Sequence, residues 1–170
     1  MKFSLSKFEI KNRPDGFTTV ELLIIVVIII ILTGISATTF RFFGAQSALN
    51  NSTEEIINTL KIAQSKTLAS EGASQWGVYF SASTDPNQYT LFKGSSYAAR
   101  TTSSDESHEL PKTVEIYEID LWSGNEVVFE RITGFASSTA VSGKISLRLK
   151  NDASSTRIIY INHSGQVGLQ

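Results

Sequence analysis

Cysteine is absent from this 170-residue sequence. Its absence excludes a disulfide framework, a thiolate metal site and a cysteine nucleophile. The sequence also lacks a large excess of charge of either sign, because its net charge is −1. The overall charge therefore does not indicate a nucleic-acid partner. The length allows one modest folded domain together with a membrane anchor. Evidence for function must therefore come from the distribution of residues along the chain.

Charge is nearly missing from residues 17–43, where Glu21 and Arg41 are the only charged side chains. Residues 22–32 are eleven consecutive apolar residues. As an α-helix this stretch would extend roughly 40 Å, and a hydrocarbon core is about 30 Å thick. We therefore expect a transmembrane helix over residues 17–44.

Basic residues precede this apolar stretch, namely Lys7, Lys11 and Arg13. Positive charge beside a membrane helix keeps its side of the chain in the cytoplasm. The sequence therefore predicts a single-pass protein of the inner, cytoplasmic membrane. Residues 1–16 would be cytoplasmic, and the remainder would lie on the periplasmic or extracellular side.

Helical periodicity continues beyond the apolar stretch. Residues at intervals of seven, four, three and four fall on one side of a helix: Leu49, Ile56, Leu60, Ala63 and Thr67. The spacing predicts that residues 45–72 form an amphipathic helix packed on a domain, with the helix ending near residue 69 and Gly72 marking the stop.

From residue 73 to the end the pattern is that of β-structure, with alternating apolar residues and turn signals. The predicted strands are Trp76–Ser81, Gln88–Lys93, Thr113–Ile119, Glu126–Arg131, Lys144–Lys150 and Thr156–Asn162. Residues 94–109 are polar and rich in Ser and Thr, which predicts a long exposed loop. The expected class is α+β, with a long N-terminal helix followed by an antiparallel β domain over residues 73–170.

The boundary of the apolar stretch reads Pro14-Asp15-Gly16-Phe17-Thr18-Thr19-Val20-Glu21-Leu22-Leu23. It resembles the class III signal of type IV pilins and type II secretion pseudopilins. That signal has a short basic leader, a glycine, a phenylalanine, three residues, a glutamate and a long apolar helix. Gly16, Phe17 and Glu21 match it.

This resemblance implies a non-enzymatic structural subunit of a filament, with no cofactor. It also implies a leader, residues 1–16, that prepilin peptidase removes by cutting between Gly16 and Phe17. Phe17 would then be N-methylated, and Glu21 would pair with the N-terminal amine of a neighbouring subunit during assembly. Other pilin or pseudopilin subunits, the peptidase and the membrane are the implied partners.

A physical argument supports a role for Glu21. An acidic residue at the centre of a membrane helix costs about 2.5–3.5 kcal/mol, so this carboxylate needs a partner. Cleavage after Gly16 creates one in the α-amino group of Phe17, which lies one helical turn from Glu21.

Within the superfamily, the sequence is most similar to the H-type minor pseudopilins, the GspH/FimT group. The ending Ile161-Asn162-His163-Ser164-Gly165-Gln166-Val167 resembles the closing strand and turn of that group. Major type IV pilins usually have a C-terminal disulfide loop and a proline within the apolar helix. This chain has no cysteine, and the corresponding stretch contains Gly34 and no proline.

Two other interpretations of the N-terminal stretch stay open. One is a secretory signal peptide cut after Ile35-Ser36-Ala37, which would place Thr38 at the new N-terminus. The other is a plain signal anchor with Glu21 near the membrane interface. Glu21 and the continued helical pattern disfavour the first, and the order Gly-Phe-x-x-x-Glu would be a coincidence in the second.

Catalytic and metal-binding patterns are weak. There is no Gly-x-Ser-x-Gly elbow, and His108 and His163, the two histidines, fall in regions expected to be exposed. Asp105, Glu106 and Glu109 offer oxygen ligands, but their spacing matches no calcium loop. We expect a solvated acidic loop there, with no metal.

The alternative function is a minor pilin of a DNA-uptake machine that binds DNA through its β domain. Lys144, Arg148 and Lys150 would share one face of a strand, with Arg157 nearby. A solvated strand face is the simpler interpretation, and removal of the leader would leave 11 basic and 14 acidic residues, which disfavours phosphate contacts. Trp76 and Trp122 offer rings for base stacking, although strand tryptophans usually belong to the core.

Overall fold

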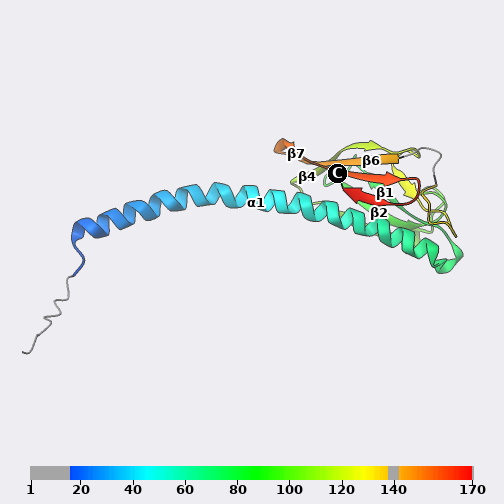
Figure 1. Cartoon of the computed structure of the whole chain (residues 1–170), viewed down its shortest axis with the longest axis horizontal. Coiled ribbons are helices and arrows are strands. Elements are labelled where there is room, and N and C mark those ends of the chain that lie inside the picture. Colours follow the sequence, from blue (N-terminus) through cyan, green and yellow to red (C-terminus); the bar gives the residue numbers. More distant parts are fainter. Residues whose placement is uncertain (1–15, 138–141, 170) are drawn as a thin grey trace, which may run out of the picture. The chain divides into compact units, whose positions relative to one another are not determined.

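The computed structural model describes residues 16–137 and 142–169, without the side chains of residues 35–41. The predicted leader, apart from Gly16, lies outside these residues. The chain divides into two compact units, residues 1–40 and 41–170. Helix α1 spans Thr19–Leu68 (Figure 1), close to the helix that the periodicity predicted.

The C-terminal end of α1 is tied to the first strand by Thr67, which is fully buried. Its hydroxyl donates to the carbonyl of Ala63 at 2.8 Å and accepts the N–H of Trp76 at 2.9 Å. A short 3₁₀ helix, Glu71–Ala73, follows and contains Gly72 at φ 62°. Glycine adopts this left-handed conformation without steric cost, so the chain reverses near the predicted stop.

Two four-stranded antiparallel sheets make up the β domain (Figure 1). The first sheet has the order β3-β2-β1-β5, with bounds Glu106–Glu109, Gln88–Lys93, Trp76–Ser81 and Glu126–Val128. The second has the order β4-β6-β7-β8, with bounds Val114–Asp120, Ser142–Leu149, Asp152–Asn162 and Val167–Leu169. The expected α+β class with antiparallel strands is confirmed.

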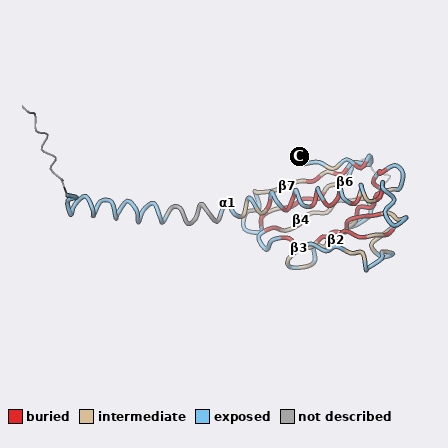
Figure 2. The backbone as a smooth tube through the Cα atoms, turned by 90° about the horizontal axis from the view of Figure 1, so that it is seen from below, coloured by how far each residue is buried: buried red, intermediate tan, exposed pale blue. Residues whose placement is uncertain are grey.

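One hydrophobic core joins α1 to both sheets (Figure 2). Four of the five helix residues that the spacing singled out are fully buried apolar side chains, namely Leu49, Ile56, Leu60 and Ala63. They share the core with Val78 and Phe80 of β1, Ile145 and Leu147 of β6, and Ile159 and Ile161 of β7. Trp76 also belongs to this core, and Trp122 packs against it, which supports the structural interpretation of both rings.

The prediction of a long exposed loop over residues 94–109 is wrong in two respects. Residues 106–109 form strand β3, which pairs with β2. The preceding segment is held on the first sheet by Tyr97, whose ring stacks on Tyr79 with centroids 3.9 Å apart and meets Phe92 edge-on at 5.5 Å. Arg100 covers the other face of Tyr97 at 3.7 Å. A single aromatic side chain thus orders a segment whose composition is otherwise typical of a loop.

The later strands differ from the prediction in extent, and β7 begins at Asp152 where the prediction began at Thr156. The predicted strand 126–131 ends at Val128, because Glu130 and Phe135 instead close a turn, with the Glu130 N–H donating to the Phe135 carbonyl at 2.8 Å. The short strand β8 was not among the predicted strands, and it pairs with β7 through three residues.

Asn87 connects the two sheets through its buried side chain. Its amide donates to the carbonyls of Ala82 at 3.0 Å and Thr84 at 2.6 Å, and its oxygen accepts the N–H of Ile116 in β4 at 2.7 Å. Each of these backbone groups would lose its partner if the amide were removed.

We expect Asn87→Ala to lower the free energy of unfolding by about 2–4 kcal/mol, because buried polar groups are left without hydrogen bonds. Chemical denaturation followed by tryptophan fluorescence measures this loss. Asn125→Ala, in an exposed turn, is the matched control and should change stability by less than about 0.5 kcal/mol. An equal effect of both substitutions would contradict the bridging role of Asn87.

Candidate functional site

The start of α1 is the first candidate site, because the sequence placed Gly16, Phe17 and Glu21 there. Residues 16–18 precede the helix, and Thr18 caps it. The Thr18 hydroxyl accepts the N–H of Glu21 at 3.2 Å, and its carbonyl accepts the N–H of Leu22 at 3.1 Å. Sequence reasoning missed this cap, although the pattern Thr-x-x-Glu is that of a capping box.

Each of the three predicted residues is accessible at this helix start. Phe17 is 78% exposed, and Glu21 is exposed in the first turn, where a negative charge is favourable beside the helix dipole. A Cβ atom at Gly16 would meet nothing within 4 Å. The described surroundings therefore give no steric reason for a glycine at this position.

The following turns of α1 expose an unusual amount of apolar surface. All eleven side chains of residues 22–32 are between 43% and 66% exposed. Apolar patches of this extent mark surfaces that another molecule covers. Figure 2 shows the same stretch as exposed, in contrast to the later turns of α1, which alternate between buried and exposed positions.

Over the residues that the structure describes, no helix combines the length and the apolar character needed to cross a membrane. The predicted span of residues 17–44 includes residues 35–41, whose side chains lie outside the described part. The span therefore stays a prediction.

The strand face proposed for DNA carries paired charges. Arg148 lies opposite Glu115 in the β4–β6 register, with Nε and Oε1 2.6 Å apart. Lys144 contacts Glu118 at 3.0 Å, and the hydrogen bond from Lys144 lowers the pKa of the Glu118 carboxyl below its ordinary value.

The other two cations near this face are also engaged. Lys150 contacts Asp85 at 2.6 Å and lowers the pKa of that carboxyl. Arg157 donates from Nε to the side-chain oxygen of Asn50 at 3.1 Å. These partners leave little positive charge available for phosphate.

The two histidines lie in different parts of the domain, and each packs against an aromatic ring. His108, in β3, faces Tyr89 in β2, and the rings stack with centroids 5.1 Å apart. His163 is exposed in the β7–β8 turn beside Phe135, at 5.4 Å between ring centroids. Asp105 accepts a hydrogen bond from Arg100 at 2.7 Å. Among the described residues, no three His, Asp or Glu side chains come together as a metal site would require.

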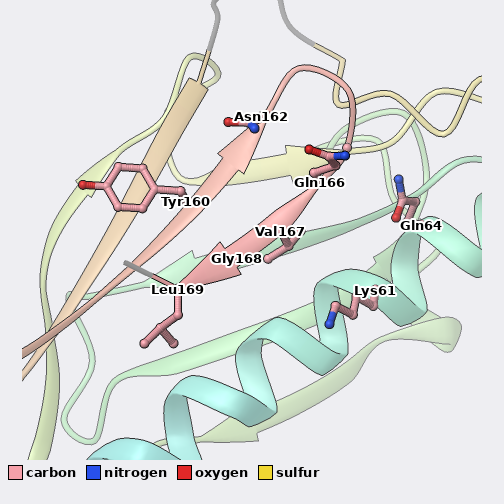
Figure 3. Close-up of a pocket in the computed structure, with 9 residues that line it drawn as sticks. Lys61, Gln64, Tyr160, Asn162, Gln166, Val167, Gly168 and Leu169 are labelled. Carbon is pink, nitrogen blue, oxygen red and sulfur yellow. The ribbon is translucent and has the colours of Figure 1, made fainter.

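A groove of about 610 Å³ lies between α1 and the β7–β8 hairpin (Figure 3). Lys61 and Gln64 line it from α1, and Tyr160, Asn162 and residues 165–169 line it from the hairpin. Sequence reasoning missed it, because the two walls are separated by about a hundred positions and no motif connects them.

At one end of this groove, the turn at Gly165 packs tightly against Gln64 of α1. Gly165 adopts φ 77°, and a Cβ atom there would collide with Gln64 and with the carbonyl of Gly134. Gln64 donates to that same carbonyl at 2.8 Å. Glycine at position 165 therefore brings the hairpin turn onto α1 and fixes one wall of the groove.

Tyr89 lines a second, smaller concavity of about 350 Å³ together with Glu55 and His108. Burial raises the pKa of Tyr89 to about 12, and the Glu55 carboxylate adds to the shift. An unfolded chain would ionise this tyrosine near pH 10, while the folded chain keeps its proton. Folding stability due to Tyr89 is therefore lost as the pH rises from about 10 to about 12.

We expect Tyr89→Phe to flatten this alkaline loss of stability, measured by denaturation at about pH 9 and about pH 11. Tyr117→Phe, which changes a tyrosine that is 41% exposed, should leave the loss unchanged. The same slope in the wild type and in Tyr89→Phe would show that Tyr89 is not the late-titrating group.

Comparison with known proteins places these features in a known fold. No protein-family model and no curated protein sequence matches the chain. The minor pseudopilin EpsH from the type 2 secretion system of Vibrio cholerae is similar in structure, with a TM-score of 0.55 at 10% identity, covering 72% of this chain and 95% of EpsH. The type IV minor pilin FimU of Pseudomonas aeruginosa has a TM-score of 0.55 at 13% identity, covering 75% of this chain and 92% of FimU.

A likeness at this level of identity concerns the fold. The chain has the pilin-like fold of these minor pseudopilins and minor pilins, so the resemblance predicted from the sequence is confirmed at the level of the fold.

Proposed function

We propose that this protein is a structural subunit, of the minor pseudopilin or minor pilin kind, in a type IV pilus-like filament or a type II secretion pseudopilus. The observation that carries the proposal is the apolar surface of residues 22–32, exposed at the start of the helix that enters a pilin-like domain. In this proposal, lipid covers that surface before assembly, and helices of neighbouring subunits cover it in the filament.

Processing by prepilin peptidase is part of the proposal. Its support is the order of Gly16, Phe17 and Glu21 at the start of α1, where all three residues are exposed. The leader would be cytoplasmic and the β domain would lie outside the cytoplasm. The subunit would act without catalysis and without a cofactor.

Glu21 would set the position of each subunit during assembly. Its carboxylate is exposed in the first helical turn, four residues after the amine that cleavage would create at Phe17. In surroundings with little water, an unpaired carboxylate is costly, so assembly is favoured when a neighbouring amine approaches it.

The DNA-uptake alternative has less support. Its expected contact face carries Lys144, Arg148 and Lys150, and each of these side chains has a carboxylate within 3.0 Å. Phosphate would have to displace these partners, which weakens the attraction that non-specific DNA binding needs.

The proposal predicts that the membrane-extracted protein begins at N-methylated Phe17, as measured by intact mass and N-terminal peptide sequencing. Gly16→Arg should accumulate uncut precursor because the side chain would obstruct the protease site, and Gly16→Ala should do so to a lesser degree. Gly168→Ala, at another glycine with open surroundings, is the control and should be processed normally. A wild-type chain that begins at Met1 or at Thr38 would exclude prepilin processing.

We expect the Glu21→Ala protein to be inserted and cleaved normally. Its incorporation into filaments should fall by about tenfold or more, because loss of one partner of a desolvated charge pair costs about 2–5 kcal/mol. Quantitative immunoblotting of sheared filaments against the membrane fraction measures incorporation. Glu54→Ala, at an exposed glutamate further along α1, serves as the control and should be incorporated like the wild type. Normal incorporation of Glu21→Ala would remove the assembly role.

A further inference from the structure

Two strands of the β domain lie at open sheet edges with opposite charge beside them. β3 ends the first sheet and β8 ends the second. Figure 2 shows β3 and β7 on opposite sides of α1, and β8 pairs with β7. An unpaired strand edge is a template for another strand, and two such edges on opposite sides of one unit can join successive copies.

The β8 edge borders the groove described above, and among the described strands only β7 pairs with it. Asn162 donates its N–H to the carbonyl of Gln166 at 2.9 Å, which sets the alternation of hydrogen-bonded pairs along the hairpin. In that alternation Tyr160 and Gly168 form the next hydrogen-bonded pair, so the N–H and C=O of Val167 point away from β7. An incoming strand could bind these groups.

Lys61 is the only charged side chain among the described residues that line this groove. It is exposed on α1, and no ion pair is formed by it within the described part of the chain. Figure 3 shows its side chain on α1, across the groove from Val167 and Gly168 of β8. A strand that enters the groove is therefore favoured if it carries a carboxylate.

β3 carries the complementary charge. All four of its residues are exposed, and two of them are the glutamates Glu106 and Glu109. Neither glutamate forms an ion pair with the residues that the structure describes. Short charged edge strands resist indiscriminate pairing, so β3 would pair where a cation meets it.

We propose that the groove between α1 and β8 of one copy receives strand β3 of a second copy, which pairs along β8 and directs a glutamate at Lys61. The contact joins different surfaces of the two copies, so it is directional and leaves one β3 and one β8 free at the ends. This contact extends the proposed function. It rests on that function in one respect, namely that subunits lie side by side in a filament.

Disulfide trapping tests the contact in the full-length protein, because the chain has no cysteine of its own. Gly168→Cys, where a Cβ atom meets nothing within 4 Å, is expressed together with a differently tagged Ser107→Cys chain, whose new thiol lies in exposed β3. Oxidation should trap a heterodimer. Ser123→Cys, an exposed serine in another turn, replaces Ser107→Cys as the control and should trap none.

Charge exchange tests the role of Lys61. Lys61→Glu in the Gly168→Cys chain should lower trapping by about fivefold or more, since an exposed pair is worth up to about 1 kcal/mol and reversal adds repulsion. Glu106→Lys together with Glu109→Lys in the Ser107→Cys chain should restore it. Arg131→Glu, at an exposed arginine outside the groove, should leave trapping unchanged.

The proposal would be overturned if the Ser123→Cys chain were trapped as efficiently as the Ser107→Cys chain. It would also be overturned if Lys61→Glu did not change the yield of trapped heterodimer. Filament incorporation is measured in the same cells, which separates the two ideas. A chain that is incorporated but not trapped keeps the proposed function and loses this contact. A chain that is trapped but not incorporated keeps the contact and loses the proposed function.

Discussion

Burial of one side of α1 in the β core is the interaction on which the rest of the domain depends. Leu49, Ile56, Leu60 and Ala63 have no exposed surface, and they belong to one core cluster with residues of both sheets. Each large apolar side chain buried in this way contributes about 1.5–3 kcal/mol. Neither sheet covers its inner face alone, so the helix, the first sheet and the second sheet form together.

The same helix has a second part with the opposite property. Residues 22–32 are apolar on all sides and exposed, whereas the later turns are apolar on one side only. A helix that is hydrophobic all round requires surroundings other than water. Within one element, the change from all-round to one-sided hydrophobicity therefore separates a part suited to lipid or neighbouring helices from a part that belongs to a folded domain.

Local patterns in the sequence were sufficient for α1, β1 and β2, because periodicity and turn residues determine them directly. They were insufficient for β3, whose order comes from cross-strand pairing with β2, and for the preceding segment, whose order comes from the ring contacts of Tyr97. The motif at Gly16, Phe17 and Glu21 is local and could be read in advance. The groove could not, since Lys61 and β8 meet only through the topology of the second sheet.

The distribution of charge shows why pairing matters more than the number of cations. Arg148 and Lys144 looked like a basic strand face, yet the β4–β6 register places Glu115 and Asp120 directly opposite them. Cross-strand pairs of this kind stabilise a sheet and leave little field for a phosphate. Lys61 looked unremarkable in the sequence, yet it borders an open strand edge without a carboxylate partner in the described part of the chain. In this fold, the register of the strands decides which charges are structural and which are available to another molecule.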